Sequence, residues 1–105
     1  MVKFKVKDDK WTALVFETEE FDRRFEPGDA AYCDAANKQL IFDETELDLA
    51  TVTHEMCHLY ISYQYHSSAG LSVDQFEEII CELWAKEGAH ILRQSRQLLK
   101  LLKKE

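Results

Sequence analysis

The spacing of apolar residues changes near residue 43, and this change divides the chain into two halves with different expected structure. Before it, apolar and polar side chains alternate, as in Val2-Lys3-Phe4-Lys5-Val6, which is the period of a half-buried strand. After it, apolar residues recur every three or four positions, which is the period of a helix. Strands in one half and helices in the other are typical of the α+β class.

Four strands are expected in the first half, at about residues 2–6, 11–18, 31–34 and 38–42. The last two read as a hairpin closed around Ala36-Asn37, and Pro27-Gly28 marks a turn before it. We therefore expect a small, mostly antiparallel N-terminal sheet.

Two helices are expected in the second half. The first runs from about residue 46 to residue 65, with Asp43 or Thr45 as its cap. After a loop at residues 66–71, Ser72 and Gln75 have the spacing of a capping box, which predicts a long helix towards the C-terminus. Both sides of the first helix are largely apolar, so we expect the sheet to cover one and the second helix to cover the other.

The composition predicts one globular domain spanning residues 1–105, since 46% of the residues are hydrophobic and only three glycines and one proline occur. The formal net charge of −7 argues against binding to nucleic acid or to an anionic membrane. The start lacks the apolar stretch of a signal peptide, and no apolar run is long enough to span a bilayer. Three widely spaced cysteines, Cys33, Cys57 and Cys81, are expected to be reduced, mostly buried thiols of a cytoplasmic protein.

The strongest chemical signal is His-Glu-Met-Cys-His at residues 54–58. On a helix, residues i and i+4 lie one above the other, so His54 and His58 can converge on one metal ion, and zinc is the ion expected for this pattern. Glu55 projects about 100° away and is the expected general base for a water molecule at that ion. A chance occurrence of two histidines and a glutamate on an amphipathic helix is the alternative.

Catalytic zinc sites usually have a third protein ligand, and the second helix offers one. Glu78 and Glu82 are four residues apart, so they share a helix face, which Ala85 and Ala89 continue. We expect Glu78 to bind zinc and Glu82 to accept the second N–H group of a zinc-bound histidine. The alternative is that both are ordinary solvated charges.

At these residues the chain resembles the gluzincin metallopeptidases, which have HExxH on one helix and a zinc-binding glutamate on the next. Glu78 follows His58 by twenty positions and Glu82 follows by four more, which is similar to the spacing often found in gluzincins. The resemblance implies a zincin-like fold, with an edge strand, here residues 38–42, over the cleft. Residues 53–58 and 76–82 also resemble small HExxH proteins of bacterial prophages.

The expected function is zinc-dependent hydrolysis of peptide bonds in a peptide or protein substrate. In gluzincins, a His or Tyr of a second subdomain stabilises the oxyanion. Here we expect such a group to come from within residues 1–105. The candidates are Tyr60, Tyr63, Tyr65, His66 and His90. One alternative is a zinc-binding interaction module without enzymatic activity. The resemblance to prophage proteins implies that such a module would be phage-related. Another is a latent peptidase, in which Cys33 could reach the zinc. The apolar residues 91–102 either complete the core or form a homodimer interface through the C-terminal helix.

Overall fold

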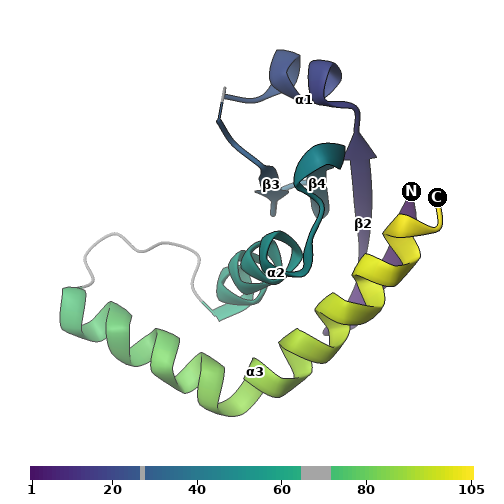
Figure 1. Ribbon diagram of the computed structural model, residues 1–105. Coiled ribbons are helices and arrows are strands. Elements are labelled where there is room, and N and C mark those ends of the chain that lie inside the picture. Colours follow the sequence, from purple (N-terminus) through teal and green to yellow (C-terminus); the bar gives the residue numbers. More distant parts are fainter. Residues whose placement is uncertain (27, 65–71) are drawn as a thin grey trace.

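The computed structural model describes residues 1–26, 28–64 and 72–105, which form a four-stranded mixed sheet, three α-helices and a short 3-10 helix (Figure 1). The expected α+β class is confirmed, with every described strand ahead of the two long helices. The elements are β1 (Val2–Val6), β2 (Asp9–Phe16), α1 (Thr18–Arg24), β3 (Ala31–Asp34), β4 (Gln39–Asp43), η1 (Glu44–Glu46), α2 (Leu49–Gln64) and α3 (Val73–Lys103).

The sheet has the strand order β1-β2-β4-β3. Its two outer pairs are antiparallel, and the predicted hairpin is confirmed because Ala31 pairs with Phe42 and Asp34 pairs with Gln39. The central pair, β2 with β4, is parallel, since α1 and β3 lie between these strands in the sequence. Because β4 lies inside the sheet, the expectation that residues 38–42 form the edge strand was wrong, and β3 is that edge.

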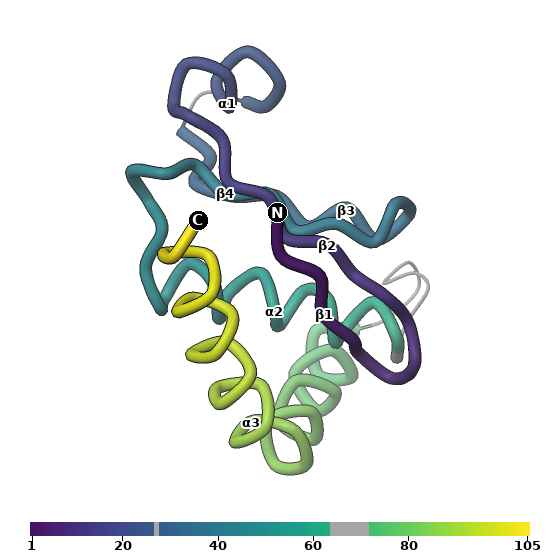
Figure 2. The backbone as a smooth tube through the Cα atoms, turned by 90° about the vertical axis from the view of Figure 1, so that its right-hand side faces the viewer, coloured from purple at the N-terminus to yellow at the C-terminus, as the bar shows by residue number. Residues whose placement is uncertain are grey.

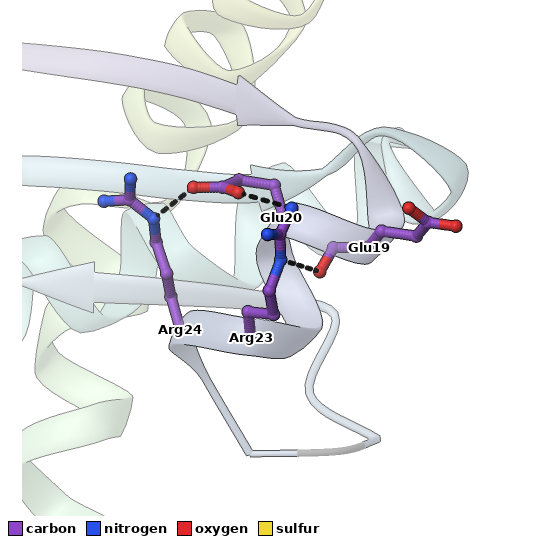
Figure 3. Close-up of polar contacts among 4 residues, drawn as sticks. All are labelled: Glu19, Glu20, Arg23 and Arg24. Carbon is purple, nitrogen blue, oxygen red and sulfur yellow. Dashed lines mark hydrogen bonds and ion pairs between the residues drawn. The ribbon is translucent and has the colours of Figure 1, made fainter.

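Helix α1 was not predicted from the sequence, which pointed only to a turn around Pro27-Gly28. It is held by its own surface charges: Arg24 donates to Glu20 at 2.7 Å, and Arg23 lies 3.0 Å from the same carboxylate (Figure 3). Phe21 on its inner side is fully buried. Gly28 has a φ of +96°, a conformation that glycine adopts without steric cost, so the chain does turn there.

Helix α2 buries one of its two apolar sides fully and the other in part. Val52, Met56, Leu59 and Tyr60 lie in the core. On the other side Cys57 and Ile61 are half-buried against the core and face α3, whereas His54 and His58 are exposed. The expectation that both sides would be buried is therefore met only in part. The helix begins after Asp48, whose carboxylate accepts the Thr51 N–H at 2.8 Å, and Asp43 instead caps η1.

The C-terminal end of α2 is fixed to the turn between β1 and β2. Lys7 and Asp8 have φ values of 48° and 71°, as a tight hairpin turn requires. Tyr63 donates to Asp9 at 2.7 Å and accepts from the Trp11 indole N–H at 2.7 Å. These bonds hold the helix against the sheet from which the site is built.

Helix α3 begins at the predicted capping box, in which Ser72 and Gln75 each bond the other's backbone N–H. Ile91, Leu98 and Leu102 are buried, so the C-terminal apolar residues largely complete the core, although Leu101 is exposed. The helix curves past α2 towards β1, and the two chain ends lie together in both views (Figures 1 and 2). Within the described residues, no helix is both long enough and apolar enough to cross a membrane.

Candidate metal centre

His54 and His58 lie on consecutive turns of α2 and point to the same place. Their Nε2 atoms are 3.2 Å apart, and their rings meet edge to face with centroids 4.8 Å apart. Both side chains are exposed. The convergence predicted from the i, i+4 spacing is therefore present in the structure.

The separation of the two nitrogens suits a zinc ion. Two nitrogens that each lie about 2.0–2.1 Å from a tetrahedral zinc are roughly 3.3 Å apart, close to the 3.2 Å between the Nε2 atoms. The same distance also permits a hydrogen bond between the rings when one Nε2 carries a hydrogen. The pair thus has the separation that a two-histidine zinc chelate requires.

Glu55 differs from both neighbours because it is buried, with 6% of its surface exposed. Burial raises the pKa of its carboxyl, the charges of His58 and His54 act in the opposite direction, and Asp29 adds to the rise. The net effect is a raised pKa, because desolvation disfavours the carboxylate form. A carboxylate in such a place accepts a proton more readily than a solvated one.

A cleft of about 450 Å³ lies between α2 and β3 and reaches all three motif residues. A second hollow of about 420 Å³ continues from it towards the start of α2, and both are lined by Asp29, Ala31, His54 and Glu55. Strand β3 is an outer strand of the sheet, and Ala31, Tyr32 and Cys33 of this strand line the cleft. The cleft therefore runs along an outer strand past the histidine pair.

Five cleft residues come from β3 and its flanks, namely Asp29, Ala31, Tyr32, Cys33 and Ala35. Asp29 and Tyr32 were not predicted at the site from the sequence. They would have been found if β3 had been recognised as the edge strand. Cys33 lines the cleft, and burial, followed by the charges of Glu55 and Asp34, raises its pKa to about 12. Its surroundings therefore favour the protonated thiol.

The three cysteines form no disulfide with one another. Cys33 and Cys57 are half-buried, as small apolar residues are expected to be, but Cys81 is exposed on α3. The expectation of buried thiols thus holds only for the first two.

The structure does not bring Glu78 and Glu82 to the histidine pair. Both are exposed, and each is two residues from Ile80, which faces the histidines. Two residues along a helix correspond to a rotation of about 200°, so both glutamates lie on the far side of α3. Across residues 1–26, 28–64 and 72–105, no three His, Cys, Asp or Glu side chains are grouped closely enough to hold a metal.

The candidates for an oxyanion donor are also placed by the fold. Tyr60 is buried and donates to Gln94 at 2.7 Å, and Tyr63 donates to Asp9, so both hydroxyls are engaged away from the cleft. His90 is exposed and stacks edge to face on Tyr60. Tyr65 and His66 lie outside the described residues. The tyrosine that lines the cleft is Tyr32.

Comparison of the chain with protein-family models, with curated proteins and with solved structures found no match. The resemblance to gluzincins therefore rests on the motif residues, and the site is interpreted from its own geometry.

Proposed function

We propose that the chain binds one zinc ion through His54 and His58 and hydrolyses peptide bonds. The observation that carries this proposal is the 3.2 Å separation of the two Nε2 atoms at the mouth of a cleft, next to a buried glutamate. A zinc ion supplies two things when bound: it makes a water molecule more acidic, and it polarises a carbonyl group.

The role proposed for Glu55 is to move a proton. Its side chain is buried at the cleft that also contains both histidines, and it is next to His54 in the sequence. It would take a proton from the attacking water and deliver it to the nitrogen of the leaving amine. Because the carboxylate is recovered when the amine leaves, the cycle returns Glu55 to its starting state.

The role proposed for β3 is to align the substrate. An extended peptide can add to an exposed sheet edge through main-chain hydrogen bonds, and the cleft follows β3 from Ala31 to Ala35. Tyr32 also lines this cleft. A polypeptide substrate therefore suits the shape of the site.

The second candidate is a zinc-binding interaction module that has no hydrolytic activity. It needs the histidine pair to bind the ion but makes no use of Glu55 as a base. Glu78 as third ligand and Glu82 as its partner stay predictions from the sequence.

The two candidates are separated by the substitution Glu55→Gln. Glutamine keeps the size of the side chain but cannot accept the proton, so we expect unchanged zinc content with at least about a hundredfold loss in kcat/KM for a cleaved peptide. Zinc is measured by elemental analysis and cleavage with a broad peptide library. Glu46→Gln, an exposed position on η1, is the matched control and should behave as the wild type.

Wild-type protein that binds zinc and cleaves nothing in the library would favour the interaction module. Equal cleavage by Glu55→Gln and wild type would refute the role given to Glu55. Protein that takes up no zinc would refute both candidates.

A further inference from the structure

A second hollow adjoins the histidine pair on the side facing α3, and its character differs from that of the cleft along β3. Its volume is about 210 Å³, and it lies between α2 and α3. Apart from His54 and His58, its lining consists of the apolar or weakly polar side chains Cys57, Ile61, Ile80, Leu83 and Trp84. The two histidines therefore stand between a polar cleft and an apolar pocket.

Trp84 forms an exposed wall of this pocket, with 43% of its surface open to solvent. Large apolar side chains are usually buried in a small domain, and isolated exceptions need no explanation. Trp84 is different from an isolated exception because it borders a pocket that also contains both proposed zinc ligands. An apolar group placed in the pocket would cover this exposed indole surface.

Gly88 explains how the indole is held against α3. A Cβ atom at this position would lie 2.5 Å from Cε3 of Trp84, which is closer than any carbon contact allows. Glycine is disfavoured inside a helix relative to alanine, and here its place in the middle of α3 leaves room for the indole one turn earlier. Gly88 thus positions the wall of the pocket.

We propose that Trp84 determines specificity: the pocket it forms receives an apolar side chain of a peptide whose backbone lies at the histidine pair. A peptide held there has β3 on one side and this pocket on the other, so a side chain directed towards α3 meets mainly apolar atoms. The inference rests on the proposed function, because it requires that a ligand be held at the zinc ligands.

The test uses two probes that differ only in their side chain, N-acetyl-leucine hydroxamate and N-acetyl-alanine hydroxamate, with zinc-loaded protein. Each hydroxamate anchors to the metal, so the ratio of the two dissociation constants, measured by calorimetry, reports the side-chain pocket. We expect the leucine probe to bind at least about tenfold more tightly to the wild type, since each buried methylene group contributes several-fold in affinity.

In Trp84→Ala this ratio should fall towards one, because the pocket loses a wall while the exposed position leaves the fold intact. In Gly88→Ala the ratio should also fall, because the new methyl group displaces the indole. Leu101→Ala removes another exposed apolar side chain from α3, seventeen residues further on, and should keep the wild-type ratio.

Zinc content is measured first, so that failure of the pocket assignment can be distinguished from failure of zinc binding. Zinc-loaded wild type with equal affinity for both probes, or a Trp84→Ala variant with an unchanged ratio, would overturn the pocket assignment and leave the proposed function standing. Protein without zinc would overturn the proposed function and this inference with it.

Discussion

At the scale of single residues, Asp43 joins three segments through one oxygen. Its Oδ1 atom accepts from the Thr18 hydroxyl at 2.7 Å, the Thr45 hydroxyl at 2.9 Å and the Thr45 N–H at 3.1 Å. Burial opposes its charge, but the hydrogen bonds from Thr18 and Thr45 outweigh burial and lower its pKa. Asp43→Ala should therefore reduce the free energy of unfolding by about 1–3 kcal/mol, measured in urea. Asp43→Asn should cost less, because its Oδ1 can accept the same bonds.

The free energy of unfolding should depend differently on pH in the wild type and in Asp43→Asn. A carboxyl whose pKa is lowered by folding contributes its full stability above its unfolded pKa of about 3.9, and that stability disappears as the pH falls through the lower folded value. The wild type should thus lose more stability than Asp43→Asn as the pH is lowered below about 4. Parallel curves for the two proteins would show that the charge of Asp43 contributes nothing.

At the scale of elements, the rotation of α3 about its axis decides which of its side chains can reach the zinc. As described, α3 turns Ile80, Leu83 and Trp84 towards the histidines. If this orientation holds with zinc bound, Glu78→Ala and Glu77→Ala should both retain zinc, measured by elemental analysis and by competition with a chromogenic chelator. The sequence pattern alone predicts the opposite for Glu78, namely loss of zinc.

One outcome would decide against the described orientation. Loss of zinc in Glu78→Ala but not in Glu77→Ala would mean that α3 turns by about half a rotation when the metal binds. Such a rotation would also move Trp84 away from the histidines, so the preference for the leucine probe should then be absent. The zinc and hydroxamate measurements therefore check each other.

At the scale of the whole molecule, zinc should stabilise the fold by mass action. A ligand that binds only the folded state at a free concentration of 100 times its Kd adds about 2.7 kcal/mol to the free energy of unfolding. The wild type should show this increase in urea unfolding, and His54→Ala and His58→Ala should not. Both histidines belong to α2 alone, so we expect these variants to stay folded without zinc.

His90→Ala is the matched control, because His90 is also exposed and lies on α3 away from the pair. It should respond to zinc as the wild type does. A zinc response that persists in both His54→Ala and His58→Ala would place the metal elsewhere.

The sequence by itself determined the features that depend on neighbouring residues. The i, i+4 spacing brings His54 and His58 together, because a helix fixes that geometry without help from the rest of the chain. The Ser72–Gln75 capping box and the hairpin of β3 and β4 were predicted for the same reason. Helix α1 escaped prediction because it is short, and its one fully buried residue, Phe21, gives no apolar periodicity.

Only the tertiary structure decided what depends on contacts between distant segments. The parallel pairing of β2 with β4 makes β3 the edge strand and brings Asp29, Tyr32 and Cys33 to the cleft. It also buries Glu55 while its neighbour His54 is exposed. The rotation of α3 about its axis also depends on contacts between distant segments. Periodicity shows that Glu78 and Glu82 share a face, but the packing of Ile80 and Leu83 against α2 sets which way that face points, because burial of apolar surface outweighs the placement of two solvated charges.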